Sequence, residues 1–193
     1  TSGNGLVNDT WVQLSKNLAR AIAAIEVLKP LSESGDVQAS GALYEMIALR
    51  GYLNMLMLDS WGLAFKKDQA FETSVILRGQ EAIDYIQSDL LSVVDKINTD
   101  KGPGRLTQNA VWAMLSRLHL NAAVYRDPYG TPNFTQEDMN KVVEYSNNII
   151  NSGKHTLSPE YFELFNDDNH NVSEIIWAIY QRGVLASEHI MTN

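Results

Sequence analysis

The stretch from Ala42 to Gly62, ALYEMIALRGYLNMLMLDSWG, is apolar on nearly every side of a helix. Its apolar residues recur at spacings of three and four, and others widen the stripe, which predicts a helix covered on more than one side. Arg50 lies in its middle, and Asp59, Trp61 and Gly62 end it. Because an unpaired buried charge is prohibitively costly, we expect Arg50 to pair with an acid or with carbonyl groups at a helix end.

Two further segments show a narrower apolar stripe, typical of helices that cover a core from one side. The first spans residues 11–28, with Asp9 or Thr10 as its N-cap and Pro30 as its stop. The second spans residues 83–97 and carries acids on its polar side. These two outer helices each precede a more apolar helix, a pattern that stacked helix hairpins require.

The remaining segments complete a mainly-α pattern. Residues 110–125 are again apolar almost all round, with Arg117 and His119 embedded, and we interpret His119 as a hydrogen-bonded core residue. The last helix begins near Thr135, where TQED resembles a capping box, and ends at Gly153.

Three segments outside these helices complete the prediction. Residues 32–41 (SESGDVQASG) are expected to form a loop, SPEYFELF (158–165) a short helical piece, and EIIWAIY (174–180) a strand. The fold predicted is therefore all-α in the main. It consists of tetratricopeptide-like stacked helix hairpins with a short strand or irregular C-terminal piece, in a single helical-repeat domain over residues 1–193.

Composition narrows the classes of function. The chain has 193 residues, 45% of them apolar and 20% charged, which is typical of a folded globular protein. Its formal net charge of -8 disfavours nucleic acid as a partner, because phosphate binding needs a basic surface. It has no cysteine, which excludes disulfides and thiolate metal sites. The start of the sequence shows no signal peptide, and no apolar run is long enough for a membrane helix.

Catalytic and metal-binding patterns are weak. The four histidines do not fall at helical metal-ligand spacings, and no nucleophile or phosphate-loop motif occurs. Asp167, Asn169 and Asn171 match the first ligand positions of a calcium loop, but Val172 replaces its glycine and Ala178 its terminal glutamate. We therefore predict no catalytic residue, no metal and no cofactor.

Two carboxylates and two aromatics remain as candidates. Glu45 and Asp59 lie in apolar settings, where we interpret them as an arginine partner and a helix-end acceptor. Trp61 and Tyr129 lie at or near loops, where an aromatic face can stack on sugar C–H groups. They are the candidate ligand-binding residues, although the edge of the core is the favoured place for an aromatic at such positions.

The order of these segments resembles the SusD/RagB family of surface glycan-binding lipoproteins of Bacteroidetes. The opening stretch is similar to the family helix A-x-x-R-F-L-R-A-x-x-Y-F-x-L-x-x-x-F-G, with Arg50 at its second arginine and Trp61-Gly62 at its Phe-Gly stop. YIQSDLLSVV resembles Y-x-x-I-x-x-D-L-x-x-A, and Gly104-Arg105 with the helix that follows resembles G-R-x-x-x-x-A-A-x-x-L-L-A-R-x-Y-L. The stretch from residue 152 to residue 179 matches the block that ends in E-I-I.

The resemblance implies a non-enzymatic protein of polysaccharide utilization, lipid-anchored at the surface of the outer membrane. It would bind an oligosaccharide or another nutrient and deliver it to a SusC-like TonB-dependent transporter. Arg50, Asp89, Arg105 and Arg117 match family positions and imply scaffold roles. At Trp61 the family has a phenylalanine that closes the helix, which favours a core position for this ring.

The sequence departs from the family in three places. The usual Gly-Val-Pro after Gly62 is missing, Glu45 and Met46 lie near the position of the first arginine, and the chain is much shorter than family members. We therefore expect a fragment of a longer SusD-like protein. A generic helical-repeat scaffold for protein partners is the alternative function, and a glycan hydrolase is a third that the lack of an acid/base pair disfavours.

Overall fold

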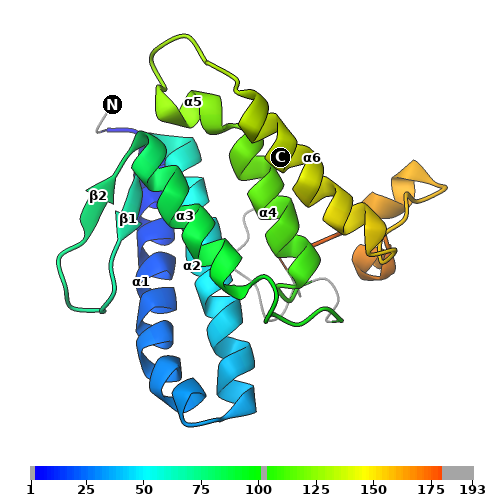
Figure 1. Cartoon of the computed structure of the whole chain (residues 1–193), viewed down its shortest axis with the longest axis horizontal. Helices are drawn as coiled ribbons and strands as arrows, with labels where there is room; N and C mark the ends of the chain where they lie inside the picture. The colour runs from blue at the N-terminus through cyan, green and yellow to red at the C-terminus, as the bar shows by residue number, and fades with distance from the viewer. Residues whose placement is uncertain (1–2, 101–103, 180–193) are drawn as a thin grey trace.

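The computed structural model describes residues 3–100 and 104–179 and shows packed helices with a small β-hairpin at one side (Figure 1). The long helices α1 and α2 lie against each other, α3 packs on α2, and α6 packs on α4. The mainly-α prediction is confirmed. The elements are α1 (Gly5–Glu33), α2 (Val37–Trp61), β1 (Ala64–Lys66), β2 (Val75–Leu77), α3 (Gly79–Val93), α4 (Gln108–Leu120), α5 (Ala122–Arg126), α6 (Gln136–Asn151), η1 (Tyr161–Phe165) and η2 (Asn169–Asn171).

The first hairpin joins α1 and α2 through a turn of three residues. Helix α1 starts earlier than predicted, because the side chain of Asn4 accepts a hydrogen bond from the Val7 backbone N–H and caps it. Pro30 does not stop the helix; it lies exposed in the last turns, where water can satisfy the carbonyl that proline leaves without a donor. The predicted loop at 32–41 is also wrong over most of its length. Asp36 caps α2 through the N–H groups of residues 38 and 39.

The hairpin of β1 and β2 was not predicted from the sequence. The strands pair antiparallel, with Phe65 opposite Ile76. The fully buried Asn54 of α2 accepts a hydrogen bond of 2.8 Å from the Phe65 backbone N–H, which fixes the start of the hairpin to the helix. At the exit of α2, Gly62 adopts a φ of +65° and turns the chain from the helix into β1.

The second half of the core is built by α3, α4, α5 and α6. The predicted helix over 110–125 is divided at Asn121, whose backbone is not helical. The Asn121 side chain donates a hydrogen bond to the Arg117 carbonyl. The predicted N-cap Thr135 is confirmed, since its Oγ1 accepts from the Asp138 N–H. Gly153, with a φ of +65°, follows the end of α6 as predicted. Fully buried apolar side chains from α2, α3 and α4 form the main core: Met55, Ile83, Ile86, Leu90, Val111, Leu115 and Leu118.

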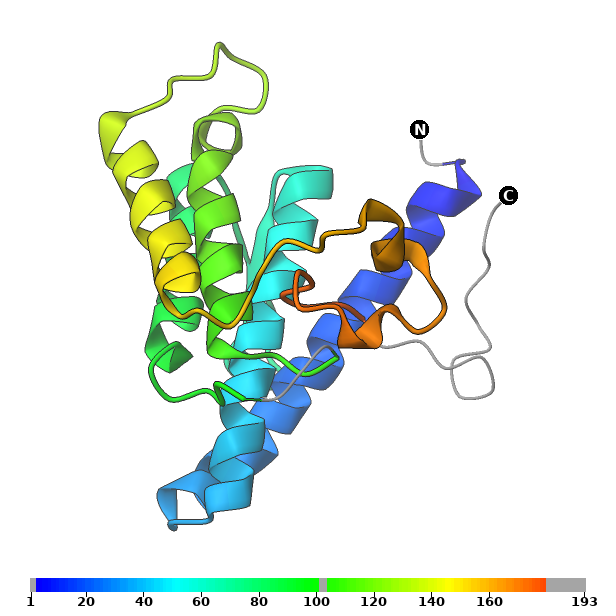
Figure 2. The same ribbon diagram turned by 90° about the vertical axis from the view of Figure 1, so that its right-hand side faces the viewer.

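The chain after α6 is irregular and crosses back toward α1 and α2 (Figure 2). The predicted short helical piece is a 3₁₀ turn, η1. The predicted strand is wrong for residues 174–179, and Tyr180 lies outside the described residues. These residues have no neighbouring strand to pair with in the described chain. Instead Trp177 packs edge-to-face on Tyr52 of α2, with ring centroids 4.8 Å apart.

Among the described residues, the helices are too short or too polar for any of them to cross a bilayer.

Candidate functional site

Arg50 joins α2 to α3 through Asp89. Its Nε and Nη2 donate to the two carboxylate oxygens at 2.8 and 2.7 Å, and both side chains are nearly buried. The guanidinium also lies 5.8 Å from the centre of the Tyr85 ring. Burial and the nearby Asp89 carboxylate raise the pKa of Tyr85 to about 12, so that ring stays neutral. Burial likewise raises the pKa of Asp89, against the opposing effect of the Arg50 contact.

Two more ion pairs bind neighbouring segments to α2. Arg105 makes a two-point contact with Glu45, at 2.8 and 2.5 Å. Arg117 of α4 lies 2.6 Å from Asp59, and the Tyr125 hydroxyl donates to the other oxygen of the same carboxylate. Burial, followed by that hydrogen bond, raises the pKa of Tyr125. Glu45 and Asp59 therefore serve as arginine partners, and all three pairs tie α2 to neighbouring segments of the chain.

A buried polar junction, formed by Gln87, His119, Arg126, Thr135 and Asp138, connects α3, α4, α5 and α6. The His119 ring lies between Asp138 and Gln87, with Nδ1 3.2 Å from the Asp138 carboxylate and Nε2 2.6 Å from the side-chain oxygen of Gln87. Arg126 donates twice to Asp138, and Thr135 donates once. Hydrogen bonds from Arg126 hold the pKa of Asp138 well below its usual range, while burial lowers the pKa of His119. His119 is a hydrogen-bonded core residue, as predicted.

Trp61 ends α2 and is half-buried. Trp11 lies edge-to-face on it, with ring centroids 5.1 Å apart, and on Phe65 at 5.7 Å. The three rings thus connect α1, the end of α2 and β1. Part of the Trp61 ring is held in this contact and part faces solvent.

Tyr129 lies on the loop between α5 and α6 and is fully exposed. Its backbone N–H reaches Asp127, which orders the turn around it. A Cβ built on Gly62 would lie 3.8 Å from Pro128, so this loop approaches the end of α2. The structure therefore brings the loop of Tyr129 close to the end of α2, where Trp61 lies.

An apolar groove lies between α1 and α2. Its volume is about 730 Å³, and residues 177–179 of the irregular C-terminal segment form one of its walls. Arg20 and Asn17 are the polar residues of the α1 wall. The other lining side chains are mainly apolar, among them Leu14, Met46, Leu49, Tyr52, Leu53 and Leu56.

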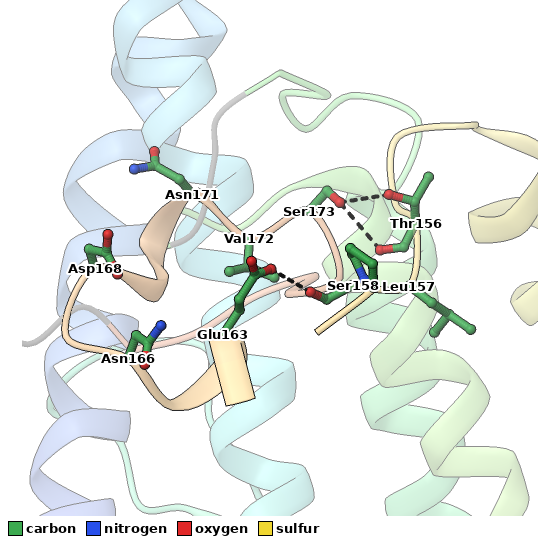
Figure 3. Close-up of a pocket in the computed structure, with 10 residues that line it drawn as sticks. Thr156, Leu157, Ser158, Glu163, Asn166, Asp168, Asn171, Val172 and Ser173 are labelled. Carbon is green, nitrogen blue, oxygen red and sulfur yellow. Dashed lines mark hydrogen bonds between the residues drawn. The ribbon is translucent and has the colours of Figure 1, made fainter. Parts of the chain in front are cut away.

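A second cavity, called here the polar pocket, lies within the segment after α6. It has a volume of about 370 Å³, and its polar lining comes from Thr156, Ser158, Glu163, Asn166, Asp168, Asn171 and Ser173. Figure 3 shows Asn166 and Asp168 on the turn between η1 and η2, with Glu163 and Ser158 joined by a hydrogen bond beside them. The sequence analysis considered Asn171 of this lining only as a calcium-loop position and did not predict the cavity, because its residues lie in turns whose geometry has no periodic signal.

The fold defines a mainly-α protein of packed helix hairpins, and comparison with known proteins gives the family. No model of a known protein family matches the chain. The chain is 35% identical over 147 residues to the starch-binding protein SusD of Bacteroides thetaiotaomicron, a match that covers 72% of this chain and 25% of that protein. The chain is a member of the SusD/RagB-like family.

Solved structures show the same fold. One crystal structure with a xylogluco-oligosaccharide superposes with a TM-score of 0.79 at 19% identity, over 93% of this chain and 36% of that one. A SusD-like protein from Bacteroides fragilis gives a TM-score of 0.70 at 18% identity, over 92% and 34%. The chain thus spans about a quarter of SusD and about a third of these structures.

Proposed function

We propose that this protein is a non-catalytic component of polysaccharide uptake that binds oligosaccharides. The observation that carries the proposal is the 35% identity to a protein that binds starch. A neighbour in fold has been crystallised with a xylogluco-oligosaccharide, which adds support at the level of architecture.

The carboxylates support a binding role over hydrolysis. A glycosidase needs one carboxyl group that is protonated near neutral pH beside a second that is ionised. Asp89 has a raised pKa, but both of its oxygens are held by Arg50 and it is nearly buried. Asp138 has a lowered pKa and lies inside the buried polar junction. Neither group is placed to protonate a glycosidic oxygen.

Family membership supports the rest of the proposal. The chain would be the helical-repeat part of a longer protein that is lipid-anchored at the cell surface. That protein would deliver its oligosaccharide to a SusC-like TonB-dependent transporter in the outer membrane. Co-purification of the full-length protein with such a transporter would test this step.

Trp61 and Tyr129 are the proposed sugar-contacting aromatics. Tyr129 offers both faces of its ring to solvent, and its loop approaches the end of α2 where Trp61 lies half-exposed. The C–H groups of a sugar can stack on such rings, which gives affinity for a glycan chain.

Affinity gel electrophoresis against plant, host and microbial polysaccharides tests the binding role. We expect one class of glycan to retard the protein without being hydrolysed. Tyr129→Ala should reduce the retardation, whereas Phe71→Ala, which removes another fully exposed ring on the hairpin, should not. Migration unchanged by every glycan would contradict the proposal, and release of reducing sugar ends would restore the hydrolase alternative.

The apolar groove is the observation that favours the second candidate, a helical-repeat scaffold. Its walls are mainly apolar, unlike a typical sugar site, and one of them is formed by residues 177–179. The same gel assay separates the two functions, because a scaffold for protein partners predicts no retardation by glycans.

A further inference from the structure

The polar pocket combines the side chains that sugars require. Hydroxyl groups of a sugar are recognised by planar carboxylates, whose oxygens accept hydrogen bonds, and by amides, which both accept and donate. The pocket offers Glu163 and Asp168 as carboxylates and Asn166 as an amide. Its volume of about 370 Å³ lies in the range of small-ligand sites, and matches a mono- or disaccharide.

The lining is held in position by hydrogen bonds within the segment. The Ser158 hydroxyl donates to Glu163 at 2.7 Å, and the Ser158 backbone N–H donates to Glu174 at 2.8 Å. Thr156 and Ser173 are joined through their hydroxyls at 2.7 Å. Two stretches of chain, before η1 and after η2, are thereby tied together, and the Glu163 carboxylate is fixed at the cavity (Figure 3).

An exposed aromatic cluster lies on the same 3₁₀ turn as Glu163. It consists of Tyr161, Phe162 and Phe165, which are 66%, 77% and 68% exposed. Tyr161 contacts the other two rings, with centroids 5.5 and 5.4 Å apart. Three exposed aromatics beside a polar cavity form the pairing of an apolar platform with hydrogen-bonding groups that carbohydrate sites use.

The local charge selects the kind of ligand. The carboxylates Glu160, Glu163, Asp167 and Asp168 lie in or beside the pocket, so an anionic sugar or a phosphate would be repelled. A metal ion is disfavoured as well, because no cluster of three acidic or histidine side chains is placed to hold one in the parts of the chain that the structure describes. Asn169, one of the calcium-loop positions, instead donates its amide to the Leu164 carbonyl. Among sugars, a neutral one therefore fits this lining best.

We propose that the polar pocket and the aromatic cluster form a binding site for a neutral oligosaccharide, distinct from Trp61 and Tyr129. One sugar unit occupies the pocket and hydrogen-bonds to Glu163 and Asp168. An adjoining unit stacks on the aromatic cluster. This inference rests on the proposed glycan-binding function and assigns a place for it in the irregular segment.

Calorimetric titration with maltoheptaose and with a xylogluco-oligosaccharide tests the site. Glu163→Gln, Asp168→Asn and Phe162→Ala are expected to weaken binding of the preferred oligosaccharide by about tenfold each, the effect of losing one hydrogen bond to a charged group or one stacking contact. Glu160→Gln is the matched control, since this acid lies on the same turn but does not line the pocket, and it should leave the affinity unchanged. Far-UV circular dichroism checks that each variant keeps the helical fold.

The outcomes separate the site from the function. Normal binding by Glu163→Gln, Asp168→Asn and Phe162→Ala, with loss of binding in Tyr129→Ala, would overturn the pocket proposal and leave the glycan-binding function intact. Absence of binding by the unaltered protein to either probe, with no retardation in the glycan gels, would overturn both. Binding abolished by a chelator would also overturn the proposal, because it would require a metal ion at the site instead of direct contact with a neutral sugar.

Discussion

Arg50 carries a charge into a helix that is otherwise apolar, and the structure shows what compensates its burial. Asp89 accepts from it twice, and the Arg50 guanidinium carbon lies over the Tyr85 ring. The sequence predicted that an acid or carbonyl groups would pair with Arg50, because the alternative is prohibitive. It could not select Asp89 from the 23 acids, since a partner 39 residues away depends on how α3 packs on α2.

Truncation of Arg50 should therefore be costly. Arg50→Ala leaves the Asp89 carboxylate buried without its partner, and we expect a loss of about 3 kcal/mol in the free energy of unfolding. Urea denaturation followed by circular dichroism measures it. Lys141→Ala, which removes a pair with the exposed Glu137 one turn away on α6, should cost less than about 0.5 kcal/mol. Equal losses in the two variants would show that burial of the pair does not matter.

Helix α2 contains two glycines, Gly41 and Gly51, in different surroundings. Gly51 faces α3, where a Cβ would lie 3.0 Å from Cδ2 of the fully buried Leu90. Gly41 is exposed on the same helix and has nothing within 4 Å of its Cβ position. The first glycine permits close approach of two helices, whereas the second only lowers helix propensity.

The two glycines should respond with opposite sign to the same substitution. Gly51→Ala forces Leu90 to move in a filled core, and we expect a net destabilisation of about 1–2 kcal/mol despite the gain in helix propensity. Gly41→Ala should stabilise by about 0.5–1 kcal/mol. Thermal denaturation of both variants measures the change in stability. A stabilised Gly51→Ala would show that Leu90 can shift without strain.

Elements were predictable where a periodic stripe or a cap residue defined them. Thr135 and Gly153 fixed the ends of α6, because their side-chain and backbone preferences are local. The start of α1, the path through Pro30 and the break at Asn121 were missed. At Pro30, exposure to solvent lets the helix continue past a residue that usually ends helices. At Asn4 and Asn121, a single side-chain hydrogen bond decides where a helix begins or breaks.

Strands and site were less predictable for a related reason. The hairpin of β1 and β2 depends on Asn54, whose amide oxygen holds the Phe65 N–H from another element. Residues 174–179 have the composition of a strand, but the described chain offers them no partner strand. The polar pocket likewise comes from turns that meet in space, and only Trp61 and Tyr129 could be selected from their places at loops.

At the scale of the whole molecule, the buried polar junction holds the second half of the fold together. Asp138 receives hydrogen bonds from His119, Arg126 and Thr135, and the His119 ring reaches across to Gln87. The pKa of Asp138 in the folded state is below its value in the unfolded chain. The folded state therefore favours the ionised form, and the resulting stability is present above the unfolded pKa.

Acid should weaken this junction. Below about pH 4 the unfolded chain takes up a proton at Asp138 more readily than the folded one, so the free energy of unfolding falls as the pH drops toward the lowered pKa. Asp138→Asn should lose about 3 kcal/mol at pH 7, and its difference from the unaltered protein should shrink toward about pH 2. Urea titrations at several pH values measure the difference. A constant gap at all pH values would assign the effect to packing instead of charge.

The junction also has a kinetic consequence. Gln87 and His119 are 32 residues apart, and Asp138 and Arg126 come from two further helices, so all four must be docked before the hydrogen bonds can close. The α1–α2 hairpin, by contrast, forms across a turn of three residues. Interactions that form after the transition state slow unfolding without speeding folding. We therefore expect the junction to set how long the native state survives, while the first hairpin sets how fast it is reached.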